Sequence, residues 1–168
     1  TDFVFSQGPT DVLDHSCSTM AFGGKMGIDG TKKLPEELAM SILQEAKSFT
    51  QAAIEKLKLK TDFPEIIDVN TRLLDMGISL VFISVEKNRK GHLRELTQQL
   101  YNLTEFENIK SVIFLEGNID ITAIADAVWR FSNNVDPKRD YILAHHHDKV
   151  SISFDGTRKT KALDGFQR

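Results

Sequence analysis

The middle of the chain alternates short apolar runs with longer segments in which apolar residues recur every three or four positions. The runs predict strands covered on both faces, at residues 78–85, 111–115 and 141–144. The segments between them predict helices at residues 92–103 and 121–131, each with one apolar side. Strands that alternate with helices through short connections favour right-handed crossovers, so we expect a parallel sheet.

The second of these helices has clear start and stop signals. Asp120 is expected to cap its first turn, and Pro137 with the preceding asparagines is expected to stop it. Its buried side is expected to carry an apolar set: Ile121, Ile124, Ala125, Val128 and Phe131, with Trp129 beside them. This helix should therefore pack along the predicted sheet.

The N-terminal third follows a different pattern. Residues 3–5 form an apolar run typical of a buried strand, and residues 8–34 are predicted to form a long irregular connection. Residues 35–60 carry one apolar stripe and predict a linking helix, and residues 65–70 predict a short edge strand. The predicted fold is α/β and three-layer, a mainly parallel sheet with helices on both faces, plus a long N-terminal loop and the linking helix.

Composition narrows the class of protein. The 168 residues carry a formal net charge of −3, which argues against a general nucleic-acid binder. No apolar run approaches the roughly 20 residues of a membrane span and no secretory signal is expected, so we expect a cytoplasmic protein. Cys17 is the only cysteine, which excludes an intrachain disulfide. A structural thiol is the preferred interpretation of Cys17, and a reactive nucleophile is the alternative.

Residues 23–33 are rich in glycine and lysine and contain the first candidate chemistry. So many glycines do not suit a helix or a plain strand, so a loop is predicted. One interpretation is an anion-binding loop, in which backbone N–H groups and lysines surround a phosphate or carboxylate. The other is a surface loop held by an internal Asp–Lys pair. The candidate residues are Lys25, Asp29, Thr31, Lys32 and Lys33.

The end of the chain repeats its beginning. Residues 139–143 resemble residues 1–5, and residues 153–159 match residues 27–33. In both copies a strand is followed by a loop that closes on Asp-Gly-Thr, a basic residue and lysine. The second copy therefore adds three candidates to the same kind of anion-binding or interface loop: Asp155, Arg158 and Lys159.

Several of these motifs resemble the C-terminal end of the UbiD family of decarboxylases. The N-terminal match departs from the family at Gly30, where alanine is common, and it comprises residues 8–9, 11, 13–15 and 24–33. Further matches lie at residues 64–69, 91–92, 127–129 and 133–140. Before the match at residues 91–92, Lys90 stands where the family has proline. In the match at residues 133–140, Asp136 or Asp140 is expected to pair with Arg139 or to cap the turn.

The resemblance implies the C-terminal region of a longer decarboxylase that uses prenylated FMN with a divalent metal and potassium. UbiD enzymes remove CO₂ without oxidation, and the resemblance implies a parent protein that acts on an aromatic precursor of ubiquinone or menaquinone. The family's catalytic, metal-binding and cofactor-binding groups lie in its N-terminal and middle regions, so none is carried over to this chain. We expect the isolated chain to be inactive, to contact the rest of the parent chain and to form a homo-oligomer.

A tandem arrangement accounts for both the repeat and the resemblance. Residues 1–34 would be the last strand and tail of one UbiD C-terminal domain, residues 35–62 a linking helix, and residues 63–168 a second, degenerate copy. The alternative is one domain that reuses a similar loop. In the tandem interpretation the strand at residues 3–5 pairs with this sheet or with another chain, because exposed apolar edges favour aggregation.

Two histidine motifs complete the candidate chemistry. His145, His146 and His147, followed by Asp148, could bind zinc or another transition metal. On an extended chain the first and third histidines share one face and the second faces away, so a polar strand end is preferred. Asp14-His15 could orient a base, but no partner nucleophile is identifiable. The rival function is a stand-alone anion- or ligand-binding or protein-interaction module using Lys25, Lys32, Lys33, Arg158 and Lys159.

Overall fold

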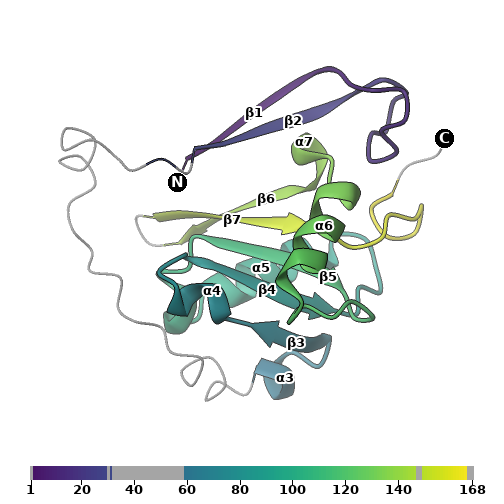
Figure 1. The fold of residues 1–168 in the computed structure, drawn as a ribbon. Coiled ribbons are helices and arrows are strands. Elements are labelled where there is room, and N and C mark those ends of the chain that lie inside the picture. Colours follow the sequence, from purple (N-terminus) through teal and green to yellow (C-terminus); the bar gives the residue numbers. More distant parts are fainter. Residues whose placement is uncertain (1, 30, 32–58, 147–148, 166–168) are drawn as a thin grey trace.

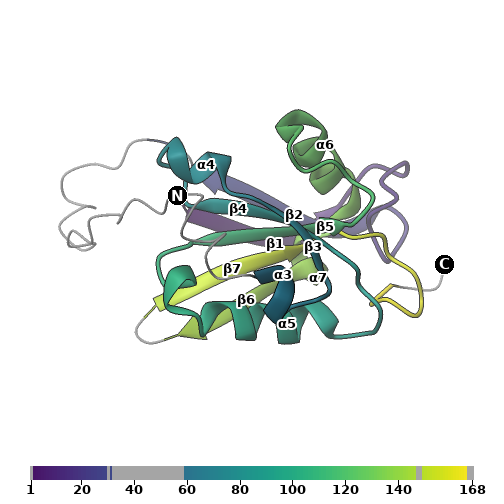
Figure 2. The same ribbon diagram turned by 90° about the horizontal axis from the view of Figure 1, so that it is seen from below.

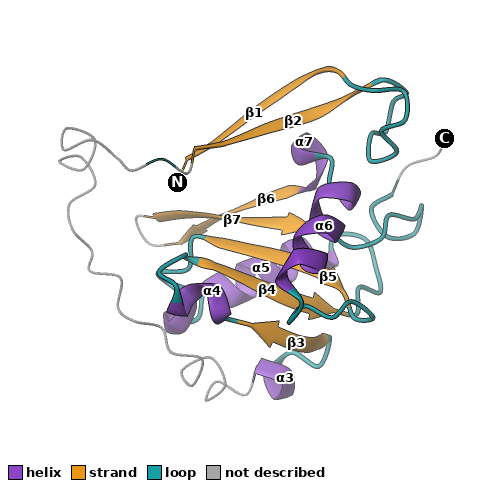
Figure 3. Cartoon of the chain, viewed as in Figure 1, coloured by secondary structure: helices purple, strands orange, loops and turns teal. Residues whose placement is uncertain are grey.

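The computed structural model describes residues 2–29, 31, 59–146 and 149–165 (Figure 1). The strands are β1 (Asp2–Pro9), β2 (Phe22–Asp29), β3 (Ile66–Asn70), β4 (Leu80–Val85), β5 (Ser111–Glu116), β6 (Tyr141–His146) and β7 (Lys149–Asp155). The helices are α3 (Leu59–Asp62), α4 (Arg72–Asp75), α5 (His92–Tyr101), α6 (Ile124–Asn134) and α7 (Pro137–Asp140), with a 3-10 turn, η1 (Thr104–Phe106). The strands form a two-stranded hairpin and a five-stranded sheet (Figure 3).

The five-stranded sheet is mixed and has the order β3-β4-β5-β7-β6. β4, β5 and β7 are parallel to one another, whereas β3 and β6 are antiparallel edge strands. The predicted α/β class is confirmed, and so are the strands expected at residues 65–70, 78–85 and 111–115.

The third predicted strand of a parallel sheet, at residues 141–144, is instead the antiparallel edge strand β6. β7 takes the place beside β5, and the sequence interpretation missed β7 as a strand. Its alternating serines resemble a polar surface, yet Ser151 and Ser153 are both buried. The Ser151 hydroxyl donates to the Ile109 carbonyl at 3.0 Å, which satisfies a polar group inside the core.

Apolar side chains pack on both faces of this sheet. Neighbouring residues of a strand point to opposite faces, and accordingly Val112 and Ile113 of β5 belong to two different clusters. α5 supplies three buried leucines to the cluster that contains Val112: Leu93, Leu96 and Leu100. α6 supplies Ala127 to the other cluster, and Figure 2 shows α5 and α6 on opposite sides of the strands.

α6 begins later than the sequence predicts. Asp120 does not cap it, because Asp120 Oδ1 accepts hydrogen bonds from Thr122 N at 2.9 Å and Thr122 Oγ1 at 2.6 Å. These bonds close a turn, and the helix begins at Ile124. The buried side also differs from the prediction: Ala127 is buried, whereas Val128 and Trp129 are 45% and 62% exposed.

β1 and β2 form an antiparallel hairpin, so the predicted irregular connection at residues 8–34 is wrong over residues 8–9 and 22–29. The apolar run at residues 3–5 is a strand, as predicted, but it pairs with β2 and not with the five-stranded sheet. The hairpin packs by its aromatic side chains, since Phe3 and Phe5 lie 5.8 and 6.3 Å from the Phe154 ring. In Figure 1 it runs alongside β6 and β7, next to α7.

Close approach to α7 explains why a strand carries consecutive glycines. A Cβ on Gly24 would lie 2.8 Å from Lys138 Cβ, and nearer still to the Asp136 carboxylate and the Lys138 nitrogen. A Cβ on Gly23 would overlap Cys17 Sγ. Glycine is therefore needed here for space and not for a turn. The linking helix predicted at residues 35–62 lies outside the described residues, except for the last four, which form α3.

Candidate functional site

Buried charged side chains gather where the parallel strands β4 and β7 end. Lys87 follows β4, and its Nζ lies 2.5 Å from Asp155 Oδ2 at the end of β7 and 2.8 Å from Asp164 Oδ2. Lys87 also donates to the Leu163 carbonyl at 3.0 Å. The Lys87 and Asp155 side chains are only 2% and 8% exposed. Because the carboxyl ends of parallel strands commonly hold ligands, this edge is the first place to look for a site.

A second lysine extends this arrangement toward α7. Lys159 Nζ lies 2.9 Å from Asp155 Oδ1 and 3.7 Å from Asp140 Oδ2. Arg139 holds the Asp140 carboxylate from the other side by two hydrogen bonds, 2.7 Å from Nε and 2.6 Å from Nη2. We refer to the set as the ion network, and its members are Lys87, Arg139, Asp140, Asp155, Lys159 and Asp164.

Burial and neighbouring charges oppose one another within the ion network. Burial alone would raise the pKa of Asp155, but the positive charges of Lys159 and Lys87 outweigh it and hold that pKa below its ordinary value. Burial raises the pKa of Asp140, and the hydrogen bond from Arg139 offsets this only in part. Burial also lowers the pKa of Lys159, despite the adjacent Asp155. The carboxylates pair with the lysine and arginine side chains, which is the arrangement expected of charges with a structural role.

The two Asp-Gly-Thr sequences of the internal repeat fold in the same way. Asp155 Oδ1 accepts hydrogen bonds from Thr157 N at 3.0 Å and Thr157 Oγ1 at 2.5 Å. Asp29 Oδ1 accepts from Thr31 N at 2.9 Å and Thr31 Oγ1 at 2.6 Å. The first-named turn is buried and the second is exposed. The repeated sequence therefore specifies a repeated local structure.

The predicted anion-binding residues lie in different surroundings. The structure brings Asp155 and Lys159 together, and the Lys159 amine is directed to carboxylates and to the Thr157 carbonyl at 3.0 Å. Arg158 donates its backbone N–H to Glu116 Oε2 at 2.9 Å. Lys25 is exposed on β2. Lys32 and Lys33 lie outside the described residues.

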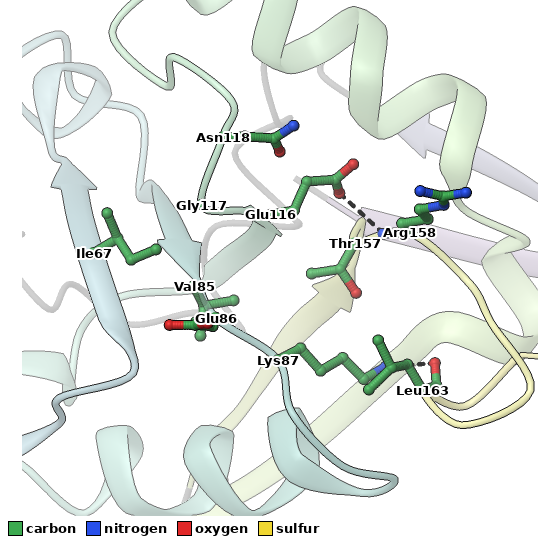
Figure 4. A pocket seen from close by; sticks show the side chains of 10 residues that line it. All are labelled: Ile67, Val85, Glu86, Lys87, Glu116, Gly117, Asn118, Thr157, Arg158 and Leu163. Carbon is green, nitrogen blue, oxygen red and sulfur yellow. Dashed lines mark hydrogen bonds between the residues drawn. The ribbon is translucent and has the colours of Figure 1, made fainter.

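A pocket of about 350 Å³ opens at this edge of the sheet (Figure 4). It is lined by Ile67, Val85, Glu86, Lys87, Glu116, Gly117, Asn118, Thr157, Arg158 and Leu163. The phosphate of a flavin mononucleotide needs positive charge or clustered N–H donors. Here Glu86 and Glu116 contribute two negative charges against the single positive charge of Arg158, and the Lys87 amine is turned toward Asp155 and Leu163. The pocket does not fit such a phosphate, and we assign no cofactor-binding residue in the described part of the chain.

A second hollow, of about 610 Å³, lies between the hairpin and the α6–α7 corner. At its margin Asp136 Oδ1 accepts a hydrogen bond from Gly24 N at 3.2 Å and also caps α7. Arg139 Nη1 donates to the Ser16 carbonyl at 2.8 Å while the same guanidinium holds Asp140. The prediction that these acidic residues cap the turn or pair with Arg139 is confirmed, and both interactions also fasten the hairpin.

The histidine motif does not form a metal centre within the described residues. His146 is buried, lies 2.9 Å from Ser151 Oγ and stacks on Tyr101 at 5.0 Å, whereas His145 is exposed. In the described ranges no group of three His, Cys, Asp or Glu side chains is placed to hold a metal ion. His147 lies outside those ranges.

The remaining candidates lie in the loop that joins β1 to β2. Asp14 Oδ1 accepts hydrogen bonds from Ser16 N and Ser16 Oγ, at 2.9 and 2.6 Å. Cys17 is buried, with its Sγ 3.5 Å from Thr10 Oγ1. These contacts favour the structural interpretation of Cys17 and place Asp14 in a local turn.

Sequence reasoning missed Lys87 and Asp164. Residues 86–90 were interpreted as a charged turn, although a lysine two residues after a buried parallel strand lies at the edge where sites form. That signal could have identified Lys87. Asp164 carries no comparable signal, because its contact with Lys87 depends on the path of the segment after β7.

Comparison with known proteins identifies the relationship of the chain. Residues 46–161 match the family model described as the 3-octaprenyl-4-hydroxybenzoate carboxy-lyase C-terminal domain. An uncharacterized protein of Helicobacter pylori J99 is 32% identical over 152 residues, which is 85% of this chain and 22% of that protein. One from Aeropyrum pernix is 24% identical over 88 residues, 52% of this chain and 18% of that protein. The chain thus spans about a fifth of the length of these relatives.

Solved structures share the fold at low sequence identity. The Sedimentibacter hydroxybenzoicus vanillic acid decarboxylase in open form is 18% identical with a TM-score of 0.53, over 62% of this chain and 25% of that chain. An evolved dimeric form of the UbiD-class enzyme HmfF from Pelotomaculum thermopropionicum, in complex with prFMN, is 18% identical with a TM-score of 0.53, over 69% and 26%. In the described part of this chain, no helix is long and apolar enough to cross a membrane.

Proposed function

The chain belongs to the UbiD family of 3-octaprenyl-4-hydroxybenzoate carboxy-lyases, and on this premise we propose that it is the C-terminal assembly and support region of a longer decarboxylase. The observation that carries the proposal is the match of the family's C-terminal domain to residues 46–161. The solved relatives support it, because this fold makes up only about a quarter of each of their chains. The function of the fold is thus best sought in what it does for the remainder of the enzyme.

The parent reaction we propose is non-oxidative loss of CO₂ from an aromatic quinone precursor, with prenylated FMN as the cofactor. This rests on the family and on the prFMN complex of the related HmfF enzyme. The cofactor, with its divalent metal and potassium, would be held outside the described residues, since the pocket near Lys87 does not fit a flavin phosphate. The described residues therefore supply support and not chemistry.

The ion network and the hairpin contacts support this role. Breaking a buried ion pair costs about 3–5 kcal/mol, because the remaining charge stays buried without its partner. Arg139 joins the hairpin, α7 and the Asp140 carboxylate in one set of bonds. A region built this way holds a fixed shape, which is what an assembly surface requires. The rival function, an anion-binding module, loses Lys159 as a candidate ligand because its amine is bonded to Asp155.

The experiment compares the natural full-length protein with the 168-residue chain. Each is reconstituted with prenylated FMN, manganese and potassium, and CO₂ release is measured with a panel of hydroxybenzoates and naphthoates. We expect release from the full-length protein alone. CO₂ release by the 168-residue chain would contradict the support role, and no release from the full-length protein with any acid would contradict the decarboxylase assignment.

A variant of the full-length protein tests the support role directly. Arg139→Ala should lower the fraction of assembled enzyme in size-exclusion chromatography while activity per assembled particle stays the same. Arg130→Ala is the matched control, because Arg130 makes a cation–π contact with the exposed Trp129 ring. A loss of activity per particle with unchanged assembly would argue for a direct catalytic contribution instead.

A further inference from the structure

The β1–β2 hairpin is a structural counterpart of the β6–β7 hairpin. The repeated sequence at the start of each hairpin aligns Phe3 with Tyr141, and the repeated sequence at the end aligns Ile28 with Phe154. In the structure Phe3 pairs with Ile28, and Tyr141 pairs with Phe154. Two separate stretches of sequence similarity thus specify one cross-strand register. The same Asp–Thr turn follows the second strand of each hairpin.

The two hairpins differ in what covers them. On the side away from β6, β7 pairs with β5 in parallel. Among the described residues, β2 pairs with β1 alone. Ile142 is 5% exposed, and its counterpart Val4 is 66% exposed. Phe154 is 1% exposed, and its counterpart Ile28 is 55% exposed. Among the residues that the structure describes, the N-terminal hairpin therefore lacks the cover that its counterpart has.

The backbone of β2 presents a row of hydrogen-bonding groups at the uncovered edge. Thr10 N donates to the Ala21 carbonyl at 3.0 Å, and the alternation of an antiparallel ladder then directs the amides of Met26 and Ile28 away from β1. Gly24 lies two residues before Met26, so its amide also points away from β1, and it donates to Asp136. A strand edge of this kind accepts a further strand.

The counterpart edge of β7 is occupied, and it shows what such an edge binds. Ile152 N donates to the Lys110 carbonyl at 3.0 Å, and Gly156 N donates to the Phe114 carbonyl at 2.9 Å. The two bonds lie at the two ends of the parallel pairing of β7 with β5, a strand whose central four residues are fully or almost fully buried. When the alignment of the repeat is extended by one residue, Met26 and Ile28 correspond to Ile152 and Phe154.

We infer that the edge of β2 at the Met26 and Ile28 amides binds a parallel, apolar strand from a preceding copy of the α/β domain in the parent protein. This inference rests on the proposed function, in which the chain is the C-terminal part of a longer enzyme. The Helicobacter pylori relative has room for such a copy, because this chain covers 22% of it. Phe3 and Phe5, packed on Phe154 and Tyr141, then form the contact between the two copies.

Hydrogen exchange tests the strand directly. Exchange is measured by mass spectrometry, with fragmentation to single amides, in the natural full-length protein and in the 168-residue chain. In the short chain the amides of Met26 and Ile28 should exchange quickly, while Ile152 and Phe154 stay protected as internal references. In the full-length protein the first pair should slow by on the order of 100-fold or more.

Equal exchange of Met26 and Ile28 in both proteins would overturn the inference. So would protection in the short chain that appears only with dimerisation, because a second copy would then be the occupant. Proline variants provide a second measurement: Ile28→Pro removes an edge amide and should destabilise only the full-length protein. Gly27→Pro removes an amide directed to β1 and should destabilise both. Destabilisation of the short chain by Ile28→Pro as large as that by Gly27→Pro would refute the assigned edge.

The inference and the proposed function can fail separately. CO₂ release by a full-length protein whose Met26 and Ile28 amides exchange freely would contradict the strand-binding inference and support the decarboxylase assignment. Protected Met26 and Ile28 amides in a full-length protein without activity would support the strand-binding inference and contradict the decarboxylase assignment.

Discussion

Replacing Gly24 by alanine should loosen the hairpin from α7. The added Cβ would lie 2.8 Å from Lys138 Cβ and nearer still to the Asp136 carboxylate and to a backbone nitrogen, so the strand has to move. Overpacking of this kind costs about 1–3 kcal/mol. The movement also breaks the hydrogen bond from Gly24 N to Asp136, and bonds to charged groups contribute roughly 1.5–3 kcal/mol. Since one shift causes both losses, we expect about 2–4 kcal/mol in total.

Gly27→Ala in the same strand is the matched control. A Cβ at Gly27 would meet its nearest neighbour, Val4 Cβ, at 4.0 Å, which is ordinary contact. Alanine there should be neutral or stabilise the protein by up to about 1 kcal/mol through the unfolded state. Urea unfolding followed by circular dichroism gives the global difference, and exchange of the β1 amides reports local release of the hairpin. Equal stability and equal β1 exchange in Gly24→Ala and Gly27→Ala would refute the close-approach argument.

Three further predictions concern buried polar groups. Arg139→Ala should cost about 3–5 kcal/mol in urea unfolding, because Asp140 stays buried without its bidentate partner, and Arg139→Lys should restore only part of this loss. The depressed pKa of Asp155 contributes stability that is present above its unfolded value of 3.8 and is lost as the pH falls through the lower folded value. Asp155→Asn should therefore unfold with a flatter dependence on pH below 4, and an unchanged acid profile would contradict the assignment. Added zinc should leave the melting temperature unchanged, since His145 and His146 lie on opposite faces of β6. His146→Ala should lower the melting temperature, because it removes the contact with Ser151. A rise in melting temperature with zinc would support the metal site.

The parts of the fold that the sequence predicts well are those set by local pattern. β4, β5 and α5 follow from runs of apolar residues and from leucines at helical spacing, and their environment agrees with that pattern. β2 and β7 could not be predicted in this way. Gly24 of β2 is required because α7 passes close by, and the buried Ser151 of β7 is tolerated because the Ile109 carbonyl accepts its hydrogen bond.

The candidate site divides along the same line. The Asp136–Asp140 motif could be interpreted from sequence because its capping and pairing partners lie within four residues. The Lys87–Asp155 pair joins residues 68 apart, and only the order of strands in the sheet brings them together. An interpretation that placed β6 beside β5 could not have found that pair.

The position of β7 has a consequence for synthesis of the protein. β7 follows every other described strand in the chain, yet it lies inside the sheet, between β5 and β6. During translation the edge of the apolar strand β5 therefore stays unpaired until residue 155, the last residue of β7, has left the ribosome. A nascent chain stalled before that point should recruit chaperones that a chain carrying β7 no longer needs.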